Sequence, residues 1–247
     1  MHRYFLAALG LLLAAPAAFA QQPDPNMTGA AAQANLNALT AGAPTVVPRG
    51  TRDGVKGSPY ADNRWRMAQI TLSNHLPLAP VPIKYDVLEQ RLLMHKPAPS
   101  LDSLQLDDRL VQQFVLLNPS TGDLAARPQV FRRFTEAPRP ADRASYVEVL
   151  HQGRYALLKH HRRTLKKANY QGAYSSDNHY DEIEDHSDYF LSANEAPAQP
   201  VKLALKSLQQ AAPALAEALK SAAAAQHPRT EADWGLVLDL ADPAAAK

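Results

Sequence analysis

The chain contains no cysteine among its 247 residues. This absence excludes a disulfide framework, a thiolate metal site and a lipid-modified cysteine, so the fold must rely on ordinary packing. Aromatic residues are also few, at 7% of the chain. After the first 20 residues no apolar run approaches the roughly 20 residues of a membrane-spanning helix, so we expect a protein that does not span a membrane.

Linear signatures of several enzyme classes are missing as well. The sequence has no Gly-x-Ser-x-Gly elbow, no phosphate-binding glycine loop, no dinucleotide fingerprint and no metalloprotease or zinc-finger spacing. We therefore expect no catalytic residue, no cofactor and no metal ligand. Carboxylates brought together only by folding leave no linear signature, so a hydrolase stays open as the alternative.

The first 20 residues have the three parts of a secretory signal peptide. Arg3 supplies the basic start, residues 5–15 form a short apolar run, and Ala18-Phe19-Ala20 is a small-x-small cleavage site. We expect cleavage near Ala20 and a mature protein in the periplasm, at the cell surface or outside the cell. Without Arg3 the chain has 25 basic and 24 acidic side chains, so net charge favours no particular partner.

Residues 21–56 are rich in Pro, Ala, Asn, Gly and Thr and poor in large apolar side chains. Such a segment buries too little surface to offset its chain entropy, which predicts a flexible tether. A weak helix over residues 30–40, anchored by Leu36 and Leu39, is compatible with the pattern.

The β-rich body is predicted over residues 57–205, either as one sheet or as two sub-sheets, 62–117 and 130–205. Apolar and polar residues alternate in the first stretch, which predicts a five-strand meander. Pro80 and Pro82 remove ladder donors from the second strand, which predicts an edge position or a bulge. In the second stretch, Gln152-Gly153 predicts a tight hairpin in which glycine takes a positive φ.

Residues 206–247 switch to a helical period. Ser207 with Gln210 and Thr230 with Asp233 have capping-box spacing, and Pro213 must kink or restart the first helix. The predicted fold class is therefore α+β: an antiparallel β meander and hairpins, followed by short C-terminal helices that cap the sheet.

Several short phrases in this order resemble a family of uncharacterised exported proteins of Bacteroidota-type bacteria. They are Gly57-Ser58-Pro59-Tyr60, Ile83-Lys84-Tyr85-Asp86-Val87-Leu88, Arg91-Leu92-Leu93, Phe114, Tyr146-Val147-Glu148-Val149-Leu150, Gly153, Leu157-Leu158-Lys159, Thr164-Leu165-Lys166-Lys167, Tyr189-Phe190 and Lys206-Ser207-Leu208. The resemblance covers residues 57–240. It implies an exported β-rich body with a helical tail and no assigned activity, so it transfers no functional residue.

Two charged runs of opposite sign are the most conspicuous chemistry. The basic run forms a candidate anion-binding cluster, with His160, His161, Tyr155 and Tyr170 close by: Arg154, Lys159, Arg162, Arg163, Lys166 and Lys167. The acidic run follows within about ten residues: Asp177, Asp181, Glu182, Glu184, Asp185 and Asp188. If the runs lie on neighbouring strands, ion pairs between them cancel most of the field, and this interpretation is favoured over binding of a polyanion.

The acidic run is also the best place to look for a metal. Its oxygen ligands suit Ca²⁺, and its two histidines would add a transition metal: Asp177, His179, Asp181, Glu182, Glu184, Asp185 and His186. However, Glu182 stands where an EF-hand turn needs glycine. A solvated acidic segment is therefore the favoured interpretation.

The sequence leads to one main functional hypothesis: an exported, non-catalytic, envelope-associated binding or structural module. Its partner is unknown, with an envelope component or another protein as candidates, and no nucleic acid is expected. A hydrolase of envelope or environmental polymers and a subunit of a larger assembly are the alternatives.

Overall fold

The computed structural model describes residues 37–40, 45–48, 54–75, 78–95, 102–117, 128–168, 180–193 and 196–242. The predicted signal peptide, residues 1–20, lies outside these ranges. No helix in the described part of the chain is long and apolar enough to cross a membrane.

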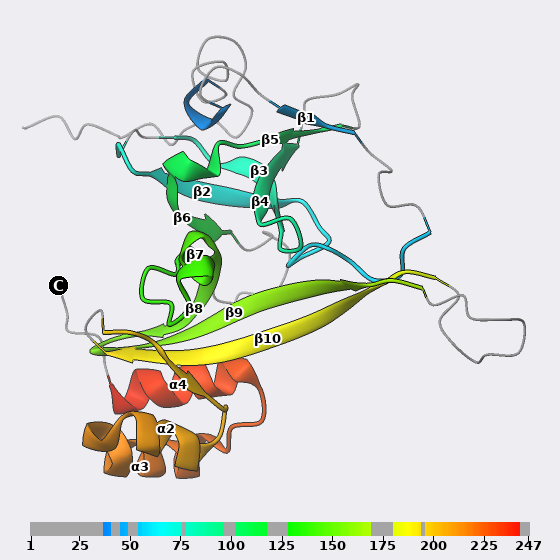
Figure 1. Ribbon diagram of the computed structural model, residues 1–247. Helices are drawn as coiled ribbons and strands as arrows, with labels where there is room; N and C mark the ends of the chain where they lie inside the picture. Colours follow the sequence, from blue (N-terminus) through cyan, green and yellow to red (C-terminus); the bar gives the residue numbers. More distant parts are fainter. Residues whose placement is uncertain are drawn as a thin grey trace, which may run out of the picture.

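A single antiparallel sheet of 11 strands forms the body (Figure 1). The strands are β1 Thr45–Val47, β2 Arg66–Leu72, β3 Val81–Asp86, β4 Arg91–His95, β5 Ser103–Gln105, β6 Val111–Leu116, β7 Gln129–Arg133, β8 Tyr146–Gln152, β9 Tyr155–Lys166, β10 Glu182–Ala193 and β11 Gln199–Val201. Their order in the sheet is β1-β5-β4-β3-β2-β6-β7-β8-β9-β10-β11. The protein is β-rich with a few short helices, and α+β describes it loosely.

The five strands predicted over the first stretch are confirmed as β2 to β6. Their connectivity is not that of a simple meander. β6 does not pair with β5, which precedes it in the chain, but with β2, on the side of β2 away from β3. The edge position predicted for the Pro82 strand is wrong, since β3 lies between β2 and β4. The β3–β4 ladder begins only at Ile83, so Pro82 needs no donor there.

The pairing of β6 with β7 joins the two predicted sub-sheets into one sheet. The hairpin predicted at Gln152-Gly153 is confirmed as the β8–β9 turn, with Gly153 N donating to the Tyr155 carbonyl at 2.9 Å. Gly153 does not have the predicted positive φ. Glycine is needed there for space instead, because a Cβ would lie 2.5 Å from the Asp242 carbonyl oxygen.

Parts of the predicted tether, residues 21–56, are built into the fold. Leu39 is fully buried in the core, and its carbonyl accepts a hydrogen bond from Asp107 N at 2.8 Å. β1 adds to β5 at one end of the sheet. Composition alone predicts a tether because one inserted leucine and one three-residue strand contribute little to the average hydrophobicity of the segment.

Four aromatic rings from β3, β6, β7 and β8 lie at the centre of a hydrophobic core. They are Tyr85, Phe114, Phe131 and Tyr146, each at most 2% exposed. Phe114 and Phe131 are register partners, and their rings stack at 4.8 Å with 7° between planes. The cluster thus packs side chains from both halves of the sheet together.

The C-terminal helices are α2 Leu205–Ala211, α3 Ala216–Gln226 and α4 Glu231–Ala241. They lie together on one side of the long strands β9 and β10, and strands β2 to β6 lie on the opposite side (Figure 1). The restart at Pro213 and the Thr230–Asp233 capping box are confirmed. The box predicted at Ser207 is wrong, because α2 begins at Leu205 and the Ser207 hydroxyl accepts from Lys202 N instead.

Gly235 allows α4 to approach β8 closely, because a Cβ there would lie 2.8 Å from the Leu150 carbonyl oxygen. Alanine ordinarily stabilises a helix interior by up to about 1 kcal/mol relative to glycine. Here we expect Gly235→Ala to lower the free energy of unfolding by about 1–3 kcal/mol, since the helix must shift from the sheet. Urea denaturation measures this change.

Ser221→Ala is the matched control, because Ser221 is exposed on α3. It should leave stability unchanged or raise it by about 0.5 kcal/mol. A gain in stability from Gly235→Ala would show that the contact between α4 and β8 is looser than described.

Candidate functional site

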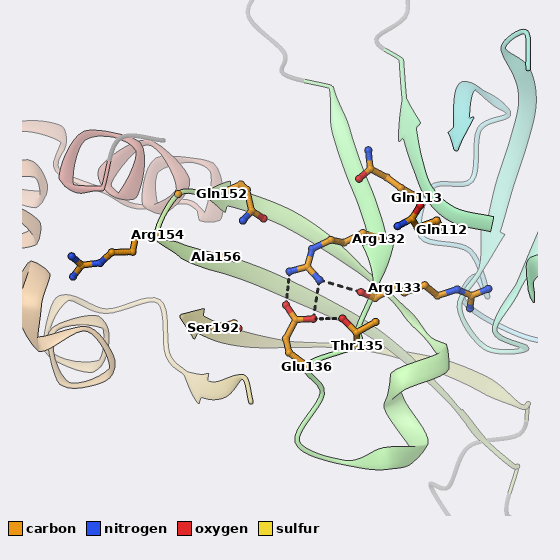
Figure 2. A pocket seen from close by; sticks show the side chains of 11 residues that line it. Gln112, Gln113, Arg132, Arg133, Thr135, Glu136, Gln152, Arg154, Ala156 and Ser192 are labelled. Atoms are coloured by element: carbon orange, nitrogen blue, oxygen red, sulfur yellow. Dashed lines mark hydrogen bonds and ion pairs between the residues drawn. The ribbon is translucent and has the colours of Figure 1, made fainter. Parts of the chain in front are cut away.

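A polar pocket of about 580 Å³ lies over strands β6 to β10, near the β8–β9 turn (Figure 2). Four separate segments of the sequence line it: Gln112, Gln113, Arg132, Arg133, Thr135, Glu136, Gln152, Gly153, Arg154, Ala156 and Ser192. Sheet pairing brings them together, because Gln113 is the register partner of Arg132, and Ala156 is the partner of both Gln152 and Ser192.

Small side chains leave the pocket hollow. Ala156 and Ser192 are side by side on β9 and β10, and both are buried. Gly153 adds a third position with little or no side chain. The Ser192 hydroxyl donates to the Ala196 carbonyl at 2.9 Å, which holds it in place at the base of the pocket.

An ion pair between Arg132 and Glu136 forms one wall. Arg132 Nη1 donates to Glu136 Oε2 at 2.8 Å and Nη2 donates to Oε1, as Figure 2 shows. Arg132 Nη1 also donates to the Arg133 carbonyl, and the Thr135 hydroxyl donates to Glu136 at 3.1 Å. The pair is fixed in a bidentate geometry, which restricts both side chains.

Glu136 remains ionised in this setting. Burial raises the pKa of its carboxyl, but hydrogen bonds from Arg132, from its own backbone and from Thr135, with the charge of Arg132, outweigh burial and lower the pKa. The group is therefore suited to accepting hydrogen bonds and poorly suited to donating a proton near neutral pH.

Three glutamine amides face the same pocket without hydrogen-bond partners among the described residues: Gln112, Gln113 and Gln152. Each amide offers both donors and an acceptor. Arg154 adds a cation at the rim, with its guanidinium 5.3 Å from the Tyr155 ring centroid. The arrangement can bind a polar molecule that is rich in hydroxyl and amide groups.

The candidate anion-binding cluster does not form one surface. Of its members, Arg154 lies at the pocket, whereas the Lys159 ammonium pairs with Glu231 of α4 at 2.7 Å. The predicted ion pairs between the charged runs are confirmed, because β9 and β10 are neighbours. They join Arg162 to Asp188, Arg163 to Asp185 and Lys166 to Glu184, while Lys167 is exposed just after β9.

The acidic run is only partly described. Asp177 and His179 lie outside the described residues, and His186 lies 3.5 Å from Glu184. Within the described ranges, no group of three or more His, Cys, Asp and Glu side chains is arranged to hold a metal ion.

A second polar cluster crosses strands β7 to β10 at Glu148, which is buried. Glu148 accepts hydrogen bonds from Gln129 Nε2 at 3.0 Å and pairs with His161 Nε2 at 2.8 Å. Lys159, the register partner of Glu148, pairs with Glu231, which also accepts from the Tyr189 hydroxyl at 2.8 Å. Each carboxylate is thus occupied by protein donors, which is typical of a structural network.

Arg154 stands out in the sequence within the basic run and Gln152-Gly153 as a predicted turn, whereas the other pocket residues give no signal. Arg132 and Glu136 are four apart but lie on a strand and the segment after it, so helical spacing does not connect them. Gln113, Gln152 and Ser192 meet only through strand pairing.

The fold and site define a β-rich protein with a polar pocket on its sheet. Comparison of the chain with family models, with curated proteins and with solved structures finds no match.

Proposed function

We propose that this protein is an exported, non-catalytic, envelope-associated binding module, and that the pocket of Figure 2 is its ligand site. The observation that carries the proposal is the set of three glutamine amides around a neutralised ion pair. The signal-peptide pattern of residues 1–20 supports export.

The charge of the pocket favours an uncharged or weakly acidic ligand. Arg132 pairs with Glu136 and Arg133 pairs with Asp108, so Arg154 is the remaining cation among the described lining residues. Amides and a fixed ion pair match hydroxyl and amide groups, as found in envelope glycans that carry N-acetyl groups. We infer that such a polymer is the ligand.

Hydrolysis is less well supported by the same geometry. A glycoside hydrolase uses two carboxyl groups across the scissile bond, one of them with a raised pKa. Glu136 is the one carboxylate among the described residues that line this pocket, and its pKa is lowered. Binding without turnover is therefore the function that the pocket supports best.

The test is sedimentation of the mature protein, starting at Gln21, with purified insoluble envelope polymer. The double variant Gln113→Ala/Gln152→Ala should bind about 10-fold or more weakly, because it loses two sets of hydrogen bonds. Both glutamines are partly or fully exposed, so the fold should be retained.

Gln226→Ala, an exposed position on α3, is the matched control and should bind like the parent. Equal binding by the parent and the double variant would rule out the pocket as the ligand site. Release of soluble fragments by the parent but not by Glu136→Gln would instead show catalysis and overturn the proposal.

A further inference from the structure

Among the described residues, one edge of β10 has no partner strand over five residues. β11 pairs with β10 only at Tyr189, Phe190 and Leu191. At the other end, Lys56 N donates to the Asp181 carbonyl and Ile183 N donates to the Lys56 carbonyl, both at 2.8 Å. Between these two contacts, residues 184–188 have no strand beside them on this edge in the part of the chain that the structure describes.

An open edge exposes backbone N–H and C=O groups that can pair with another chain. This segment already has its other edge paired with β9, so its backbone is held in the extended conformation. It is therefore a preformed template for one additional strand.

A groove of about 1020 Å³ begins where β11 ends and continues this edge. Apolar side chains line part of it, among them Pro138, Phe190, Pro200, Val201 and Leu203. Among the described lining residues four are basic, namely Arg139, Arg162, Lys202 and Lys206, and one, Asp188, is acidic.

The two lysines provide the unbalanced charge of this groove. Arg162 pairs with Asp188 at 3.2 Å and Arg139 pairs with Asp142 at 2.7 Å. Lys202 and Lys206 are exposed and form no ion pair with any described residue. The groove therefore has an excess of positive charge beside an open strand edge.

We propose that an extended peptide segment of a protein partner adds to β10 at residues 184–188, with acidic residues at one end of that segment lying against Lys202 and Lys206. This surface is separate from the polar pocket. Backbone hydrogen bonds would pair the partner segment with β10, and the lysines of the groove would favour a segment with acidic residues at that end.

The charges along the edge argue against two other occupants. Glu184 and Asp185 are already paired with Lys166 and Arg163, so among the described residues they leave no unpaired cation there for a polyanion that is charged along its whole length. A second copy of this chain, pairing edge to edge, would place the carboxylates of two such edges beside one another and would bring no acidic group to Lys202 and Lys206. An extended segment that is acidic only at one end fits both the charge-balanced edge and the two lysines.

The experiment is amide NMR of the ¹⁵N-labelled mature protein with two eight-residue probe peptides. Both alternate Thr and Val, and they carry a Glu-Glu pair at the N-terminal or the C-terminal end, because the strand direction is open. With at least one of them we expect saturable shift changes concentrated at residues 184–188 and 202–206.

Two changes test the two parts of the contact. N-methylation of alternate backbone amides in the probe should weaken binding about 10-fold or more by removing ladder donors, while its charge stays the same. Lys202→Glu with Lys206→Glu should also weaken binding about 10-fold or more. Lys220→Glu, on the exposed surface of α3, is the control and should leave affinity unchanged.

Three outcomes would overturn the proposal. One is the absence of shifts at residues 184–188 with both probes. The second is equal binding of the N-methylated probe, which would reduce the contact to charge alone. The third is unchanged affinity in the Lys202/Lys206 variant, which would show that the groove takes no part in binding the peptide.

Discussion

Replacing Phe114 by alanine should lower the free energy of unfolding by about 3–5 kcal/mol. The ring is fully buried and stacks on Phe131, and it meets Tyr85 and Tyr146 edge-on at centroid distances of 6.1 and 5.1 Å. Truncation removes these contacts and leaves a cavity that the two flanking strands, β2 and β7, cannot fill without distorting the ladder. Guanidinium denaturation measures the loss.

Because the cluster packs side chains from both halves of the sheet, hydrogen exchange should accelerate in β3 and in β8 together in this variant. Leu165→Ala is the control, since Leu165 is an apolar strand residue that is 42% exposed. It should change stability by no more than about 0.5 kcal/mol. A loss below about 1 kcal/mol for Phe114→Ala would mean that the ring is not enclosed as described.

Glu148→Ala should have the second large effect, a loss of about 2–5 kcal/mol near neutral pH. The carboxylate is buried, and its removal leaves the Gln129 amide and the His161 ring without their acceptor. Burial raises the pKa of Glu148. The hydrogen bond and charge of His161, the hydrogen bond from the Gln129 amide and the charge of Lys159 lower the pKa by more than burial raises it. The net result is a pKa below the ordinary value of 4.5.

This shift sets the pH dependence. Since the pKa of Glu148 is lower in the folded protein than in the unfolded chain, its stabilisation is complete above pH 4.5 and is lost as the pH falls through the folded-state pKa. The stability difference between the parent and Glu148→Ala should therefore shrink as the pH falls below 4.5.

Urea denaturation of both proteins across this range provides the measurement. Glu217→Ala is the control, because Glu217 is exposed in the first turn of α3 and interacts mainly with the helix dipole. It should cost less than about 1 kcal/mol. A difference between the parent and Glu148→Ala that does not change with pH would show that Glu148 acts through packing rather than through its charge.

The polar pocket shows which part of a site can be read from a sequence and which cannot. Arg154 stood out because it begins a dense run of basic residues. Gln113, Arg132 and Gln152 are ordinary polar residues in their local windows, and Gln152 drew attention only as part of a turn. They become a site because β6, β7 and β8 are adjacent in the sheet, and strand adjacency is a long-range property.

The charged runs show the reverse case. Their opposite signs and close spacing predicted neighbouring strands, and the β9–β10 register confirms the pairing. The six basic residues nevertheless reach different surroundings, because successive side chains of a strand point to opposite faces. Lys159 meets α4, whereas Arg162 and Lys166 meet β10.

By itself the sequence determined the local elements of this protein: the strands β2 to β6, the β8–β9 hairpin, the restart at Pro213 and the capped α4. Period-two alternation, turn residues and caps act over a few residues, so they are visible in the chain. Only the tertiary structure decided that β6 returns to β2, that β3 is internal despite Pro82, and that Leu39 belongs to the core. Those outcomes depend on which distant surfaces bury one another, and burial is a property of the whole fold rather than of any segment.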